Sequence, residues 1–312
     1  MSSRAARAIA LLALLAGLSG CGLGAGKELG GGAVELRVTR DFGHRSLGSK
    51  RESHVREDQT VMRLLTASFD VNTRYGGRFV QSIDGLEGRG ATGHEDWFFF
   101  VNGVESDKGA AEYELSPGDR VQWDYRRWDL AMRAPAIVGA FPEPFLHGLG
   151  GKRRPVRVEC EAPGSAPCRD ATDRLDAAGV PTAEASIGSP YTQKITRLVV
   201  ARWKQARTIG GATELEGRPT AIGVFARFAN GGRTLELLDE SGEVARTVRP
   251  GDGTGLVVAL RPRADELVWL VTGLDDRALA AGARALSEGK LLDAYAVAVT
   301  GDRVEKLPLG AR

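Results

Sequence analysis

Two cysteines that lie close together are the residues whose spacing most clearly predicts a chemical bond. Cys160 and Cys168 enclose the short segment CEAPGSAPC. A metal site would need further ligands, and no histidine lies near them in the sequence. Paired cysteines in an oxidising compartment usually form a disulfide, which for so short a loop adds about 2 to 3 kcal/mol in the chain-entropy model. We predict a disulfide that holds a turn.

Histidine, the commonest acid–base and metal-binding side chain, is scarce in this sequence. The four histidines are His44, His54, His94 and His147, and none stands in a paired motif such as HExxH. The run from His94 to Trp97 (HEDW) could be taken for a metal cluster, but it is more typical of a solvated loop. The sequence also has no G-x-S-x-G elbow and no dinucleotide-binding fingerprint. We expect no enzymatic activity and neither a metal nor a catalytic cofactor.

The first twenty residues have the organisation of a secretory signal. Arg4 and Arg7 precede an apolar run over residues 8–18, which is shorter than the roughly 20 residues of a membrane-spanning helix. The segment LSGC at 18–21 resembles the lipobox of bacterial lipoproteins. The resemblance implies cleavage before Cys21, diacylation of its thiol, and stable anchoring at the extracytoplasmic face of the cell membrane or outer membrane. An ordinary signal with an incidental cysteine is the alternative.

The composition after this leader points to a folded protein on a short tether. Residues 22–32 (GLGAGKELGGG) are rich in glycine and predict a flexible tether about 20 Å long. They lack the spacing and the Ser or Thr of a phosphate-binding loop. The leader holds two of the 42 Lys and Arg residues and none of the 40 Asp and Glu residues, so the remaining chain is close to neutral. A neutral chain with scattered charges is not expected to bind nucleic acid.

The sequence from residue 33 to residue 130 predicts a domain of strands with one early helix. Val34, Leu36 and Val38 alternate with polar residues, as in a half-buried strand. Asp58 or Thr60 is placed to cap a short helix that follows. Further strands are expected over 69–72, 79–83, 97–101 and 120–125, with turns at 75–78, 102–103 and 116–119.

Eight of the 20 aromatic residues of the chain fall between residues 97 and 128. Side chains alternate along a strand, so the residues of 97–101 divide between two faces. One face should fill the core, and the surplus could form an exposed patch that binds a ligand or partner. The alternative is that the second face packs under the Pro-rich segment that follows. The candidate binding residues are Trp97, Phe98, Phe100, Trp123, Tyr125 and Trp128.

The same region resembles a known family. The series RLLTASFDV, GRFVQSIDGL, EDWFFFVNG and GAAEYELSPGDRVQWDY, within residues 34–125, is similar to the small C-terminal β-domain of transcobalamin and intrinsic factor and to bacterial transcobalamin-C-terminal-like domains. The resemblance implies a β-grasp-like, mostly antiparallel sheet with one helix and a non-catalytic role. It also implies a face that binds a small ligand, either a corrinoid or another small molecule. It does not include the helical barrel that completes the corrinoid site in those carriers.

A Pro/Gly-rich connection over residues 131–152, which includes the segment FPEPF, leads to a second domain over 153–312. Its solid apolar runs predict an α/β domain whose strands are covered on both faces. Asp275 and Asp276 begin a predicted helix over 275–287, where carboxylates usually cap a helix, although ligands also bind at such strand–helix junctions. A helix over 168–178 and strands over 156–160, 196–203, 221–228, 234–238, 255–260, 267–272 and 294–299 complete the prediction.

Two functions are consistent with these features. The chain is either a lipoprotein that binds a small ligand and presents it to an uptake system or transporter component, or a module that docks another envelope protein through the aromatic strands and FPEPF. A concave cavity between the two domains would favour the first function, and a flat apolar patch would favour the second.

The lipobox generates a direct prediction. Mass analysis of the mature N-terminus should find a diacylated Cys21, and Cys21→Ser should release the protein in soluble form because it removes the acylated thiol. Unchanged membrane retention of Cys21→Ser would contradict the prediction.

Overall fold

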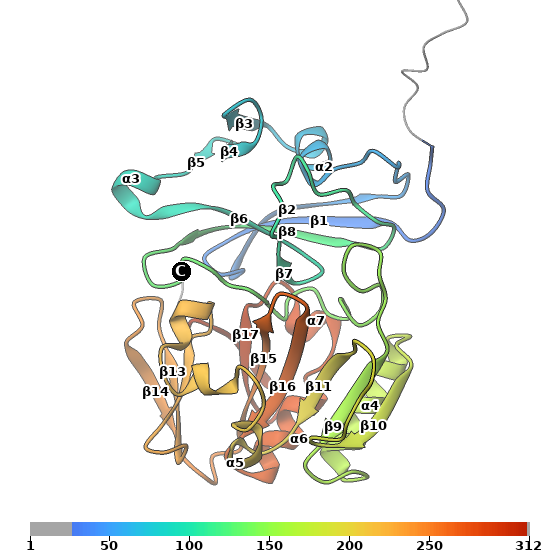
Figure 1. Cartoon of the computed structure of the whole chain (residues 1–312). Helices are drawn as coiled ribbons and strands as arrows, with labels where there is room; N and C mark the ends of the chain where they lie inside the picture. Colours follow the sequence, from blue (N-terminus) through green and yellow to red (C-terminus); the bar gives the residue numbers. More distant parts are fainter. Residues whose placement is uncertain (1–26, 311–312) are drawn as a thin grey trace, which may run out of the picture.

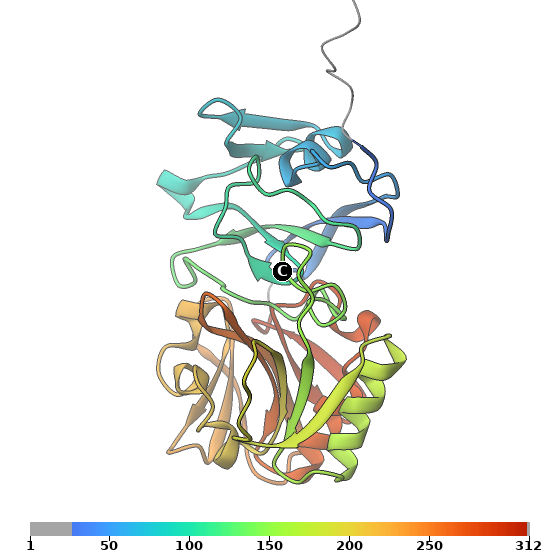
Figure 2. The same cartoon turned by 45° about the vertical axis from the view of Figure 1, so that its right-hand side comes forward.

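The computed structural model describes residues 27–310, and Cys21 with its leader lies outside this range. The described chain is rich in β-structure and forms several sheets that are stacked in two parts (Figures 1 and 2). We call residues 27–130 the first half and residues 153–310 the second half. None of the helices in the described chain has the length and apolar character needed to cross a membrane.

A five-stranded sheet forms the base of the first half. Its strands are, in spatial order, β2 (Arg45–Glu52), β1 (Val34–Arg40), β8 (Arg120–Arg127), β6 (Glu95–Val101) and β7 (Val104–Glu105). The central pair β1 and β8 is parallel, whereas the other neighbours are antiparallel. The predicted alternation of β6 is confirmed, because Trp97 and Val101 face one core while Phe100 faces another.

The upper face of this sheet is covered by the helix α2 (Val61–Ser68). Thr60 caps this helix by accepting a hydrogen bond from Arg63 N. Of the two predicted caps, Asp58 and Thr60, the structure therefore selects Thr60. The remaining elements of this half are a hairpin of β3 (Val71–Arg74) and β4 (Phe79–Ile83), the short strand β5 (Leu86–Glu87) and the short helix α3 (Gly90–Gly93). The hairpin projects from the end of the molecule that is remote from the second half (Figure 1).

The second half is built on a seven-stranded mixed sheet. Its strands are, in spatial order, β10 (Thr182–Ser186), β9 (Val156–Cys160), β11 (Thr196–Val200), β16 (Glu266–Gly273), β15 (Thr254–Arg263), β17 (Ala296–Thr300) and β18 (Arg303–Leu307). The first four are parallel, and the last three join in antiparallel fashion. The central strands are buried on both faces, as their solid apolar runs predict.

Different layers cover the two faces of this sheet. On one face lie α4 (Ala166–Ala177), α6 (Asp276–Arg284) and the short α7 (Glu288–Leu291). The other face packs against a small sheet of β12 (Ala226–Ala229), β13 (Thr234–Leu238) and β14 (Val244–Val248), with α5 (Trp203–Ala206) and two 3₁₀ turns, Ala212–Leu215 and Pro219–Ile222. The predicted disulfide between Cys160 and Cys168 is present and ties β9 to α4.

Several predicted element boundaries are corrected by the structure. The strand predicted over 69–72 is displaced to β3, and residues 219–222 form a 3₁₀ turn instead of the start of a strand. Trp203 begins α5 rather than ending a strand. The strands β2, β10, β14 and β18 were not predicted, because their residues are mostly exposed or only partly buried and so lack an apolar pattern.

The lower face of the first sheet packs directly on the second half through a buried polar contact. Asp124 Oδ1 accepts hydrogen bonds from Thr39 Oγ1 (2.7 Å) and Gly43 N (3.0 Å) in the first half. Its Oδ2 accepts a bond from Tyr295 Oη (3.0 Å) in the second half. The Phe42 ring lies edge-on to Tyr295, with centroids 5.3 Å apart. The two halves therefore share one carboxylate inside an aromatic cluster.

Three further contacts fix this interface. Arg37 forms an ion pair with Asp293, and Gln122 Nε2 donates to the Asp293 carbonyl (3.0 Å). Gly43 has a φ of +74°, and a Cβ there would lie 1.8 Å from Asp293 O. Only glycine allows both the left-handed backbone and this approach. The close contact of the two halves therefore depends on the residue types at Arg37, Gln122 and Gly43.

Burial of Asp124 predicts how stability depends on pH. Burial raises the pKa of this carboxyl to about 6, against the opposing effects of the hydrogen bond from Thr39 and the charge of Arg126. As pH rises from about 4, Asp124 therefore loses its proton in the unfolded chain before it does so in the folded one. The free energy of unfolding falls as a result, until the folded carboxyl also ionises near pH 6. From the shift of about two units, Asp124 should contribute about 3 kcal/mol to that fall. Urea unfolding of Asp124→Asn should show a correspondingly flatter profile between pH 4 and pH 7, and a profile parallel to wild type would contradict this.

Candidate ligand-binding cavity

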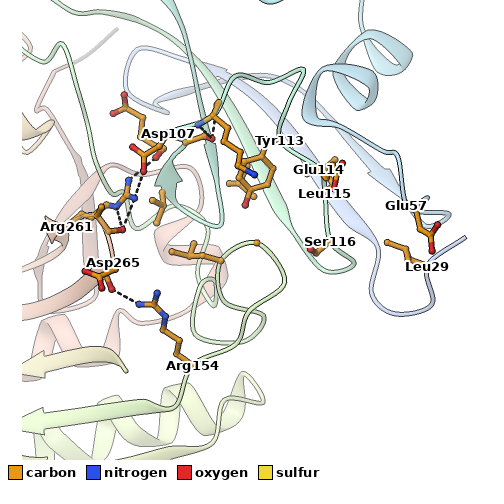
Figure 3. Close-up of a pocket in the computed structure, with 18 residues that line it drawn as sticks. Leu29, Glu57, Asp107, Tyr113, Glu114, Leu115, Ser116, Arg154, Arg261 and Asp265 are labelled. Atoms are coloured by element: carbon orange, nitrogen blue, oxygen red, sulfur yellow. Dashed lines mark hydrogen bonds and ion pairs between the residues drawn. The ribbon is translucent and has the colours of Figure 1, made fainter. Parts of the chain in front are cut away.

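A cavity of about 560 Å³ lies where the two halves meet (Figure 3). The first half supplies the hairpin of β6 and β7 and the loop over 105–116, and the second half supplies the turn between β15 and β16. Leu149 and Gly150 of the connection complete its wall. This volume lies in the range of cavities that bind small organic molecules.

The inner wall of the cavity is apolar. Val101 and Val104 flank the tight turn at Asn102 and Gly103, both of which have positive φ. The turn is held because Asn102 Nδ2 donates to Asp119 Oδ1 (2.8 Å) and to the Gly148 carbonyl (2.7 Å). The turn predicted from the NG pair is confirmed, and it presents two valines to the cavity.

Arg261 joins the two sides of the cavity. Its guanidinium donates to Asp107 Oδ2 (2.6 Å) and to the Glu105 carbonyl (3.2 Å) in the first half, while it also bonds the Ala264 carbonyl of its own turn (2.8 Å). The Arg261 side chain is 12% exposed, whereas the Asp107 side chain is 57% exposed, so the ion pair lies at the edge of the cavity and is open to water on the side of the carboxylate. The hydrogen bond with Arg261 holds the pKa of Asp107 below its usual value.

The mouth of the cavity carries charges of both signs. Arg154 Nη1 donates to the Asp265 carbonyl (2.6 Å) across the opening, and the Asp265 carboxylate pairs with Lys194 (2.7 Å). Glu114 lies on the other side (Figure 3), and Lys108 also lines the cavity. An apolar interior with a charged rim fits an amphipathic molecule that buries its apolar part and leaves polar groups at the opening.

Tyr113 provides an aromatic surface in the wall (Figure 3). Burial, together with the nearby Asp119 carboxylate, raises the pKa of Tyr113 to about 12. The phenol is therefore neutral at physiological pH and remains a hydrogen-bond donor. Behind it, burial raises the pKa of Asp119 to about 6. The wall thus presents a polar group and a ring face together.

The end of the predicted tether also reaches the cavity. Leu29 N donates to the Val55 carbonyl (2.7 Å), and Glu57 N donates to the Lys27 carbonyl (3.0 Å). This pairing brings Leu29 and Glu57 to the rim. Residues 27–29 are therefore part of the folded first half, although the glycine-rich composition predicted a tether as far as residue 32.

The six aromatic residues predicted as binding residues do not line this cavity. Trp97, Trp123 and Tyr125 are buried under α2, and Phe100 is buried against Tyr295 of the second half. Phe98 is partly buried, with the Arg126 guanidinium 3.8 Å from its centroid. Trp128 is partly exposed and lies against His94. Four of the six side chains are therefore buried rather than exposed, because α2 and the second half cover the two faces of the sheet, whereas Phe98 and Trp128 keep partial exposure.

The FPEPF segment is likewise packed inside the protein. Phe141 is 2% exposed and Phe145 is fully buried, and both rings contact Trp269 at centroid distances of 6.0 and 4.9 Å. These rings are not available to dock another protein. At the other predicted site, Asp275 accepts a bond from Ala278 N (2.9 Å), which confirms its role as a helix cap. Within residues 27–310, no three His, Cys, Asp or Glu side chains gather as a metal site.

Sequence reasoning did not find the residues of the cavity. Arg261 and Asp107 are separated by 154 positions, and neither stands in a recognisable motif. Val101 was predicted only as the end of a strand, and Val104 was not assigned to any element. The one local signal was the NG turn, which fixes the direction of two cavity residues but carries no sign of a ligand.

Comparison with known proteins finds a family model that matches part of the first half. Residues 58–127, from just before α2 to the end of β8, match a domain of unknown function (DUF4430). Among solved structures, a putative metal binding protein from Ruminococcus gnavus ATCC 29149 is similar at 13% identity and a TM-score of 0.25, covering 31% of this chain and 97% of that one. Haptocorrin in complex with Cbi is similar at 15% identity and a TM-score of 0.25, over 31% of this chain and 25% of haptocorrin. No curated protein matches the chain.

Proposed function

We propose that this chain is a lipid-anchored, extracytoplasmic binding protein whose small-molecule ligand occupies the cavity between the two halves. The observation that carries the proposal is that both halves build one cavity of about 560 Å³, whose lining combines apolar side chains with charged and polar ones. Preformed cavities of this kind, with a few polar groups at the rim, are the usual form of a small-molecule site. The proposed anchor at Cys21 rests on the lipobox.

The proposed role is non-catalytic. Tyr113 and the Arg261–Asp107 pair are among the polar groups that line the cavity, and each has a binding or structural explanation. Within the described residues, no histidine lines the cavity to act as a general base at neutral pH. The protein would hold its ligand for an uptake system rather than change it.

The same proposal assigns each half to a class of domain. We assign residues 33–130 to a β-grasp-like domain of the transcobalamin-C-terminal-like family, on the strength of the motif series in the sequence, and residues 153–312 to an α/β domain. That resemblance makes a corrinoid the first ligand to test, and a bound corrinoid would be visible by its absorbance as well as its mass. Docking of another envelope protein has less support, because the aromatic strands and FPEPF are buried.

Native mass spectrometry of the protein purified from its own host tests the proposal. We expect added mass from a retained ligand, and we expect Tyr113→Ala to retain at least about tenfold less, since tenfold corresponds to a loss of about 1.4 kcal/mol. Loss of one aromatic contact and its buried area has this order of magnitude.

Tyr75→Ala is the matched control, because Tyr75 is 80% exposed and lies outside the cavity lining. It should retain the ligand as wild type does. The proposal would fail if no mass were retained under any mild condition, or if Tyr113→Ala, shown to be folded, kept the ligand fully.

A further inference from the structure

The tip of the β3–β4 hairpin exposes two aromatic side chains that pack on each other. Tyr75 is 80% exposed and Phe79 is 41% exposed, and their ring centroids are 6.3 Å apart. Tyr75 is the most exposed of the large hydrophobic side chains in the described chain. Exposed aromatic side chains that are clustered rather than scattered indicate a surface that meets something apolar.

The turn holds Tyr75 outward at an energetic cost. Its φ is +53°, in the left-handed region that disfavours a bulky residue, and Gly76 and Gly77 continue the turn at +69° and +86°. The exposed ring adds little to the protein core. Its placement is therefore not explained by the stability of the hairpin itself.

The charge of the tip is positive. Arg74 and Arg78 flank the turn, and the sequence has no acidic residue between Asp70 and Asp84. Arg74 lies 3.6 Å from Glu87, whereas Arg78 is exposed and forms no ion pair within residues 27–310. Aromatic rings flanked by arginine suit the interface of a bilayer, where rings sit at the headgroup level and cations meet anionic lipids.

The position of the hairpin brings it to the membrane. If Cys21 is acylated, five residues separate it from Lys27, and the six Cα-to-Cα steps between the two span at most about 20 Å even when fully extended. Lys27 is bonded to Glu57, beside the start of α2. The described chain begins beside α2, on the side of the first sheet that carries the hairpin (Figures 1 and 2), and from there it runs down to Leu29 at the rim of the cavity.

We propose that the β3–β4 tip is a membrane contact, in which Tyr75 and Phe79 enter the headgroup region of an anionic bilayer while Arg74 and Arg78 bind lipid phosphates. The inference rests on the proposed anchor for its geometry. The contact turns the first half toward the lipid and lets the second half project away from the membrane. Together with the acyl chains it provides a second attachment.

The test uses the full mature chain with Cys21→Ser, so that binding requires neither lipidation nor a ligand in the cavity. Its partitioning onto vesicles of phosphatidylglycerol and phosphatidylethanolamine is measured by sedimentation, beside vesicles of phosphatidylcholine. We expect stronger binding to the anionic vesicles and a fall of about tenfold for the double variant Tyr75→Ala/Phe79→Ala. Arg78→Gln should lower binding about threefold, on the anionic vesicles only.

Tyr191→Ala is the matched control, because Tyr191 is 46% exposed but lies on the second half. It should partition as wild type does. In a second readout, Tyr75→Trp in the acylated protein should be quenched by brominated lipids more than the acylated parent chain, in which Trp97, Trp123, Trp203 and Trp269 are buried and Trp128 alone of the five native indoles is partly exposed.

The proposal is overturned if the double variant and the parent chain partition equally, or if the introduced indole is not quenched. It is also overturned if the parent chain forms a dimer that the double variant loses and neither binds vesicles, because the tip would then meet a second copy. Absence of a ligand in the cavity would contradict the proposed function but would leave these outcomes unchanged.

Discussion

The structure depends on one buried carboxylate that both halves share. Asp124 lies on the central strand of the first sheet and bonds Thr39, Gly43 and, across the interface, Tyr295. A buried carboxylate is costly unless its oxygens are bonded, and here three donors bond it. Separation of the halves would remove the bond from Tyr295 and expose the aromatic cluster around Phe42 to water. The polar contact therefore favours one arrangement of the halves, and the surrounding apolar side chains supply the area that stabilises it.

This fixed arrangement sets the shape of the cavity. Its walls come from both halves, so the distance between Val104 of β7 and the turn at Ala264 depends on how the halves are docked. Arg261 adds a second connection at the cavity itself, through Asp107 and the Glu105 carbonyl. A preformed cavity loses less conformational freedom on binding than one that must assemble around its ligand. The same rigid docking would keep the second half away from a membrane that the first half contacts.

Much of the fold follows from local patterns, whereas the site does not. The alternation of Val34, Leu36 and Val38, the apolar runs of the second sheet, the cap at Asp275 and the Cys160–Cys168 pair each predict what the structure shows. The strand β2 escapes prediction because its residues are mostly exposed, so it is held by backbone bonds to β1 rather than by an apolar face. The sequence left open whether the surplus aromatic residues of β6 and β8 are exposed, because no local pattern shows that a second half covers the sheet. Arg261 and Asp107 meet only through the tertiary fold, and their spacing in sequence carries no signal.

The central claim is that the two halves fold as one unit around the shared carboxylate, and differential scanning calorimetry of the soluble Cys21→Ser chain tests it most directly. A single cooperative unit should give one transition whose calorimetric and van't Hoff enthalpies agree. Tyr295→Phe removes the hydroxyl that bonds Asp124 and leaves that carboxylate less satisfied, so it should lower the temperature of that one transition without splitting it. Two separate transitions in the parent chain, with Tyr295→Phe leaving both unchanged, would show that the halves are independent and would contradict the account.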